Sequence, residues 1–259
     1  DQYVSAMNLD RTGQTLNTVD TCGSCNSEVL TWSVGSNGEL SYLVAPAPLA
    51  GPAKTLGVMT FSPDDHFAYE LIAQDFGIWR RNDNGTLTWI NPGFVYAPPL
   101  GGLNQQVCLI NSVAASGQGY VTLAWYGGGP GCNAGGYVLG NYTVASNGAL
   151  NLAAGSGITP QVQESSMAYD PSGVYLALGG NGVQVLKLQT NERLEPVTSA
   201  VQSPNGTIQQ ILWDNVGHVY CTTYSGLDIY NFDGQHLTLA PGSPHPITNL
   251  TGMAVIPAS

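Results

Sequence analysis

Four polar side chains stand at predicted junctions between loops and strands, where they could act together if their strands surround a channel. They are Gln106, Glu164, Gln210 and Asp75. Amide and carboxylate groups in such a ring could hydrogen-bond a sugar or a peptide, and Glu164 with Asp75 could hold a hard cation. The alternative is that these polar groups only line the channel and bind water. The sequence therefore offers four candidate ligand-binding residues and assigns catalysis to none of them.

Known catalytic motifs are absent from the sequence. It contains no Ser-His-Asp order, glycine-rich phosphate loop, zinc-ligand spacing or nucleophile elbow. His66 and His218 follow predicted turns and His236 lies in a turn, so we expect solvated roles for these three, whereas His245 lies in a proline-rich loop. No catalytic residue, metal site or cofactor is predicted.

The five cysteines indicate where in or outside the cell the protein is located. Cys22 and Cys25 have the spacing of a redox motif, but that chemistry needs the first cysteine at a helix N-terminus, and a hairpin loop is predicted here. We expect a Cys22–Cys25 disulfide, a second disulfide between Cys108 and Cys132, and a buried free thiol at Cys221. Two disulfides favour a secreted or cell-surface protein, extracellular or periplasmic.

The composition of the 259-residue chain excludes several partners. Six Lys and Arg against seventeen Asp and Glu give a net charge of −11, which would repel nucleic acid and anionic lipid. No apolar run is long enough to predict a membrane span. Only 9% of residues are charged, and Gly and Pro are abundant, which favours short strands joined by tight turns.

A hairpin turn followed by Leu recurs along the chain. Asn-Gly and Asp-Gly favour type I′ turns because both central residues need a positive φ. A large apolar residue stands six positions before the glycine or its equivalent in four copies, as expected where neighbouring sheets pack. The copies of the turn are residues 36–40, 83–87, 146–150, 190–194 and 232–237.

A second turn type alternates with the first and sets the architecture. It joins two apolar strands through Asp, Pro or Gly, at residues 7–13, 59–65, 167–173 and 211–217, with a degenerate copy at 109–119. Two alternating turns with a period of about 50 residues predict an all-β fold, a β-propeller of four-stranded antiparallel blades. We expect one domain, residues 1–259, with repeats at 3–50, 55–95, 105–155, 163–201 and 207–247.

Residues 250–257 have the pattern of a sixth inner strand. Since an unpaired strand edge is unfavourable, this closing strand should complete the ring or dock onto another molecule. Within a repeat, strands a to d run outward from the centre. The d–a and b–c connections leave at one end, here called the upper end, and the a–b and c–d turns lie at the lower end.

Residues 61–69 and 169–177 resemble a segment of the YVTN-type and lactonase-like bacterial β-propellers. The resemblance implies a propeller, commonly of seven blades, and a group that includes 6-phosphogluconolactonase-like hydrolases as well as surface and secreted proteins. Seven blades would need roughly 350 residues at this period. The family's His-rich segment before an inner strand is also missing, since residues 104–108 and 163–167 contain no histidine and only Pro244-His245-Pro246 comes near it. A lactonase site is therefore not carried over.

Three functions remain open at this stage. The first is a non-catalytic extracellular scaffold that binds a protein or carbohydrate surface, favoured by low charge, the predicted disulfides and long Pro/Gly-rich loops. The second is a lactonase-like hydrolase, which rests on the fold resemblance alone. The third is a self-assembling surface or filament subunit, a homo-oligomer formed through its terminal strand.

Overall fold

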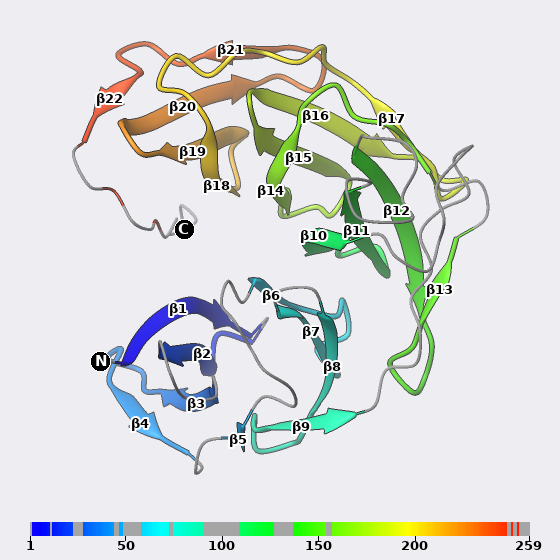
Figure 1. The fold of residues 1–259 in the computed structure, drawn as a ribbon, viewed down its shortest axis with the longest axis vertical. Coiled ribbons are helices and arrows are strands. Elements are labelled where there is room, and N and C mark those ends of the chain that lie inside the picture. The colour runs from blue at the N-terminus through cyan, green and yellow to red at the C-terminus, as the bar shows by residue number, and fades with distance from the viewer. Residues whose placement is uncertain are drawn as a thin grey trace. The chain divides into compact units, whose positions relative to one another are not determined.

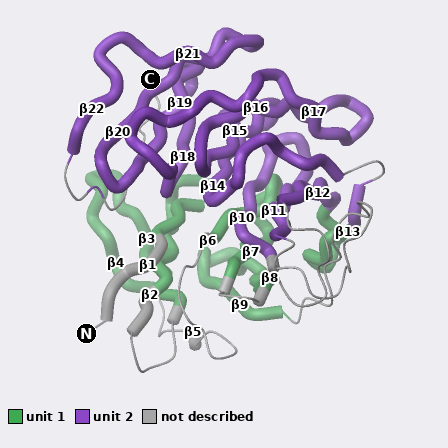
Figure 2. Tube along the Cα trace, turned by 45° about the horizontal axis from the view of Figure 1, so that its top comes forward, with its two compact units in different colours: residues 1–95, 144–151 green, residues 96–143, 152–259 purple. Residues whose placement is uncertain are grey.

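A computed structural model describes most of the chain, and every regular element in it is a β-strand (Figure 1). The described residues are 2–10, 12–22, 28–43, 47–48, 58–72, 75–90, 109–126, 137–153, 157–247, 250 and 253; of these, the side chains of 2–6, 20–22, 28, 47–48, 58, 72, 75 and 109 lie outside the description. The chain divides into two compact units, residues 1–95 with 144–151 and residues 96–143 with 152–259 (Figure 2).

The first unit holds two blades. The first blade has the strand order β1-β2-β3-β4, with β5 also paired to β3, and the second has β6-β7-β8-β9. The strands are β1 (Gln2–Leu9), β2 (Thr15–Cys22), β3 (Glu28–Val34), β4 (Leu40–Tyr42), β5 (Ala47–Pro48), β6 (Val58–Phe61), β7 (Phe67–Ile72), β8 (Asp75–Arg81) and β9 (Leu87–Ile90).

The second unit holds two complete blades and most of a third, whose outer hairpin at residues 144–151 is grouped with the first unit. The orders are β10-β11-β12-β13, β14-β15-β16-β17 and β18-β19-β20-β21, with β22 also paired to β20. The strands are β10 (Leu109–Ala115), β11 (Tyr120–Tyr126), β12 (Tyr137–Val144), β13 (Leu150–Leu152), β14 (Glu164–Tyr169), β15 (Tyr175–Gly180), β16 (Val183–Leu188), β17 (Leu194–Pro196), β18 (Ile208–Trp213), β19 (His218–Thr223), β20 (Gly226–Phe232), β21 (Leu237–Leu239) and β22 (His245–Pro246).

The a–b turns are closed by a side chain as well as by the backbone. In the fourth blade, Asp170 Oδ1 accepts hydrogen bonds from the backbone N–H groups of Val174 and Tyr175, at 3.0 and 2.8 Å. Asp10 and Asp214 close the corresponding turns in the same way. This is why the sequence repeats an acidic or hydroxyl residue at that position, since such side chains stabilise turns through local backbone bonds.

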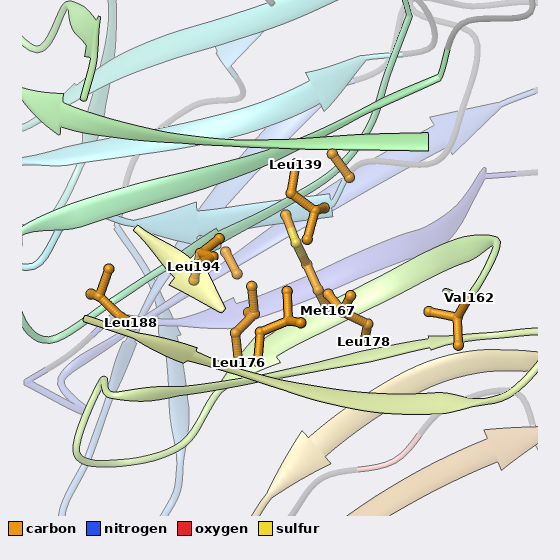
Figure 3. Packing of buried hydrophobic residues seen from close by; sticks show 10 residues of the cluster. Leu139, Val162, Met167, Leu176, Leu178, Leu188 and Leu194 are labelled. Atoms are coloured by element: carbon orange, nitrogen blue, oxygen red, sulfur yellow. The ribbon is translucent and has the colours of Figure 1, made fainter. Parts of the chain in front are cut away.

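Neighbouring blades pack through apolar sheet faces. Ala114, Ala124 and Leu139 of the third blade meet a cluster on the fourth that includes Met167 and Leu176. Figure 3 shows Leu139 facing the fourth-blade side chains. Equivalent clusters join the first blade to the second and the fourth to the fifth. Each blade thus supplies half of a core that it cannot complete alone.

The predicted fold class is confirmed: five four-strand antiparallel sheets in the described residues make this a five-bladed β-propeller. The single-domain boundaries remain a prediction. Of the predicted closing strand, only Leu250 and Met253 fall within the described residues. No helix in the described part of the chain could cross a membrane.

One glycine at a turn allows two blades to approach closely, and its substitution tests the packing. Gly173 has φ +72°, and a Cβ there would lie 2.3 Å from the backbone nitrogen of Gly117 in the neighbouring turn. Gly13 has the same φ and no atom within 4 Å of its Cβ position. Gly13→Ala should therefore cost about 1–2 kcal/mol for the left-handed backbone alone. Gly173→Ala should cost a further 1–3 kcal/mol, roughly, for the overlap.

Urea unfolding followed by circular dichroism measures both variants. Equal losses of stability in Gly13→Ala and Gly173→Ala would show that the two turns do not meet as described.

Candidate functional site

Glu164 begins β14, the inner strand of the fourth blade, and its side chain lies in the blade interface. Its register partner is Gly180, and a β-bulge separates it from Ser166, which pairs with Gly179. The bulge changes the alternation of side chains, so Glu164 shares a sheet face with Met167. In the fifth blade the equivalent position, just before the bulge, is Ile208. A carboxylate therefore occupies a position suited to an aliphatic side chain.

The backbone around Glu164 is held closely. A Cβ at Gly180 would lie 1.8 Å from the carbonyl oxygen of Gln163 and 3.2 Å from the Cα of Glu164, so only glycine fits opposite this strand end. From the third blade, Asn111 Nδ2 donates a hydrogen bond of 2.6 Å to the carbonyl oxygen of Glu164. These contacts fix the backbone from which the carboxylate projects.

The carboxylate itself is strongly perturbed. Glu164 is 0% exposed, and no well-formed hydrogen bond from a described residue reaches either of its oxygens, although the side chains of Ser112 and Asn111 lie nearby. Burial raises the pKa of Glu164 to about 7, although the side chains of Ser112 and Asn111 partly offset the rise. Loss of hydration disfavours the charged form of a carboxyl group. Glu164 is consequently divided between its acid and its carboxylate near neutral pH.

Two tyrosines extend the site toward solvent. Tyr126 and Tyr137 face each other in the β11–β12 register, with ring centroids 5.1 Å apart. They share a face of the third blade with Ala124 and Leu139, which pack on the fourth blade, so they continue that interface toward the upper end. Burial and then the charge of Glu164 raise the pKa of Tyr137, which keeps its hydroxyl protonated.

This arrangement can move a proton at neutral pH. A general base works best when its pKa lies near the operating pH, and a carboxyl group with a strongly perturbed pKa is a candidate for such a role. A protonated phenol close to it can donate a hydrogen bond. The described residues contain no group of three His, Cys, Asp or Glu side chains placed to hold a metal ion.

Of the four predicted ligand-binding residues, the structure describes the side chains of two, Glu164 and Gln210. Only Glu164 belongs to the site. Gln210 instead binds backbone, since its Oε1 accepts a 2.9 Å hydrogen bond from the N–H of Met253 and its Nε2 donates one of 3.2 Å to the carbonyl of Met253. Gln106 and the side chain of Asp75 lie outside the described residues.

The histidines have structural partners at the turns. His66, His218 and His236 each place Nδ1 within 3.1 Å of an aspartate of the same turn. His245 pairs with Leu227 at the edge of the fifth blade.

The predicted disulfides involve cysteines outside the described part of the structure. Cys25, Cys108, Cys132 and the side chain of Cys22 lie outside the described residues. Cys221 is a buried free thiol, as predicted.

A second buried carboxylate, Glu70 on β7, has a structural explanation. Burial raises the pKa of Glu70 to about 7, but its Oε2 accepts a hydrogen bond of 2.9 Å from the indole Nε1 of Trp79. In the first blade Trp32 donates to Thr18 at the same position. Glu70 thus serves as the acceptor for an indole N–H, whereas no described residue makes such a hydrogen bond to Glu164.

A pocket of about 370 Å³ opens at the lower end of the first unit, lined by residues that include His66 and Arg81. Arg81 is ion-paired with Asp10 and Asp65, and His66 with Asp64. The charged side chains that line this pocket stabilise the turns of the first two blades. Glu164 does not line the pocket.

Sequence reasoning found Glu164 but missed its neighbours. Asn111, Ser112, Tyr126 and Tyr137 read as ordinary strand residues, because their role depends on the contact between two blades. The one signal for the tyrosines is their position at the ends of two strands joined by a long glycine-rich loop.

Comparison with known proteins places the fold among the lactonase-like propellers. No protein-family model matches the chain, and no curated protein matches it in sequence. A solved structure from Bacteroides uniformis, described as a candidate 6-phosphogluconolactonase, has a TM-score of 0.68 at 13% identity, over 98% of this chain and 75% of that one. The periplasmic gluconolactonase of Pseudomonas aeruginosa has a TM-score of 0.64 at 15% identity, over 91% and 68%.

The chain has the fold of the lactonase-like β-propellers. At these identities the likeness concerns the fold, and it does not select the YVTN group within it. Sqt1 of Chaetomium thermophilum also matches, with a TM-score of 0.56 at 14% identity over 91% of this chain and 57% of that one. The activity must therefore be argued from the site.

The raised pKa of Glu164 predicts a specific dependence of stability on pH. Its folded-state pKa, about 7, exceeds the ordinary 4.5, so the folded protein binds more protons than the unfolded chain between these values. The free energy of unfolding should fall by about 3 kcal/mol as pH rises through this window. Glu164→Gln should remove this loss, and Glu70→Gln should remove a separate loss of similar size.

Chemical denaturation at pH 4 and pH 8 measures both contributions. A fall in stability that is identical in the original protein and in Glu164→Gln would contradict the buried, unpaired carboxylate.

Proposed function

We propose that this protein is a lactonase-like hydrolase in which Glu164 is the general base. The observation that carries the proposal is the fully buried carboxylate of Glu164, to which no described residue makes a well-formed hydrogen bond and whose pKa is raised to about 7. The lactonase descriptions of several proteins with this fold add support. The expected scaffold function has no comparable support in the described residues.

The reaction needs one base that later acts as an acid. Glu164 takes a proton from water as the water oxygen bonds to the lactone carbonyl carbon. The ring C–O bond then breaks, and the ring oxygen receives that proton from Glu164, so the product is a hydroxy acid. The protonated hydroxyl of Tyr137 is suited to donate a hydrogen bond to the carbonyl oxygen as negative charge develops there.

Access to the carboxylate requires a side chain to move. Because Glu164 is 0% exposed, a substrate must displace a neighbour. Tyr137 lies half-buried at the start of β12, beside the 38% exposed Tyr126, and is the side chain best placed to turn aside. Substrate binding would then complete the site, as in induced fit.

Location and assembly follow as separate proposals. The predicted disulfides and the periplasmic location of one protein with the same fold favour an exported enzyme. Assembly through the terminal strand, and binding to a protein or carbohydrate surface, remain proposals that do not depend on catalysis.

Kinetics of the base variant test the assignment. Glu164→Gln should lower kcat for lactone opening by about 10²–10⁴-fold, the usual contribution of a general base. Glu70→Gln, which changes the other buried glutamate, should keep the activity. For the original protein, kcat/KM should rise with pH to a plateau and be half-maximal near pH 7, because the base must be ionised.

A pH-stat assay on a panel of five- and six-membered lactones, corrected for spontaneous hydrolysis, gives these values. Full activity in a folded Glu164→Gln protein would disprove the role of Glu164, and hydrolysis of no lactone by the original protein would disprove the function.

A further inference from the structure

A long part of the chain contains no cationic side chain. Residues 82–186 include no Lys, Arg or His. All residues of the candidate site fall within this segment, and so do the long connections at residues 91–108 and 127–136. The third blade and most of the fourth therefore have no positive side chain to offer a ligand.

The nearest cations of the second unit belong to the lower end. Lys187 pairs with Tyr175 in the β15–β16 register and holds its Nζ 5.8 Å from that ring centroid. Glu164 pairs with Gly180 at the other end of β15. Five residues of strand separate the two levels, or about 16 Å. Arg193, the other Lys or Arg of this unit, lies in the turn between β16 and β17.

A phosphate group would be poorly stabilised at this site. Proteins bind phosphate mainly through Arg, Lys or the N–H groups of a helix N-terminus, and the described residues contain no helix. The ionised form of Glu164 would add repulsion. Charge thus selects against phosphorylated ligands.

The tyrosine pair provides a different kind of contact. Tyr126 is 38% exposed, and its ring is inclined by 40° to that of Tyr137. An exposed aromatic face is suited to the C–H face of a cyclic molecule, and Tyr126 joins the site through its contact with Tyr137.

We propose that the ligands of this site are uncharged cyclic sugar lactones, with Tyr126 as the stacking contact that selects them over phosphorylated lactones. This inference rests on the proposed hydrolase function, but it concerns substrate class and the contact that determines it. Tyr126 is a specificity residue and takes no part in proton transfer.

The first test compares glucono-1,5-lactone with its 6-phosphate as substrates. The neutral lactone should have a kcat/KM at least about tenfold higher, which corresponds to about 1.4 kcal/mol of discrimination. Tyr126→Ala should raise KM for the neutral lactone about tenfold with little change in kcat, and Tyr126→Phe should behave like the original protein. Tyr224→Ala, which removes another exposed tyrosine, should change neither constant.

A second measurement separates substrate class from catalysis. Calorimetric titration with gluconolactam, which resists hydrolysis, should show binding that Tyr126→Ala weakens and Tyr224→Ala does not. Lactam binding of this kind without hydrolysis of any lactone would support the ligand class and disprove the hydrolase. Preference for the 6-phosphate, or no lactam binding, would overturn this inference even if lactones are hydrolysed.

Discussion

The contact between one blade and the next is the interaction on which this structure depends. Each four-stranded sheet has an apolar face that its own strands cannot cover, and the neighbouring blade in the same unit covers it. Met59, Met167 and Ile211 show the result, because these inner-strand side chains are 3%, 7% and 1% exposed. Burial of apolar surface at roughly 25 cal/mol per Å² makes these interfaces the main source of stability.

The candidate site breaks the rule that such interfaces are apolar. Glu164 lies on the same strand face as Met167, at the level where the fifth blade has Ile208. A buried carboxyl group without hydrogen bonds destabilises a fold, and local rules of this kind are most often broken where function requires it. Glu70 makes the contrast clear, because its hydrogen bond from Trp79 gives it a place in the packing.

The sequence predicted the blades well because turns are local. Asn-Gly pairs and the Asp-containing a–b turns are determined by a few neighbouring residues, so their spacing was sufficient for the fold class. It did not predict that Glu164 is buried, since an undetected bulge at Ser165 decides which sheet face the side chain joins. It also assigned Gln210 to a ligand, because nothing local indicates that its amide binds the backbone of Met253.

The bulges also explain how Glu164 is held in place. The bulge residue of the third blade, Asn111, donates to the carbonyl of Glu164, and that of the fourth, Ser165, donates to the carbonyl of Ile208. In both cases the bulge residue of one inner strand binds the backbone of the next inner strand, at the residue just before that strand's own bulge. The residue that follows each bulge makes a second contact of this kind. Ser166 Oγ accepts a hydrogen bond from the backbone N–H of Ile211, and Gln210 Oε1 accepts one from the backbone N–H of Met253. Met253 therefore occupies the place of an inner-strand residue.

The same series of contacts links the fold to the proposed chemistry. A side chain that must hold the next blade's backbone cannot also serve a ligand freely, which removes Gln210 from the site. The carboxylate of Glu164 is not part of this series, because the contact to Asn111 uses its carbonyl oxygen. The packing fixes the backbone of Glu164 and leaves its carboxylate without a well-formed hydrogen bond from the described residues. That separation of roles is the strongest physical reason to look for its function in chemistry.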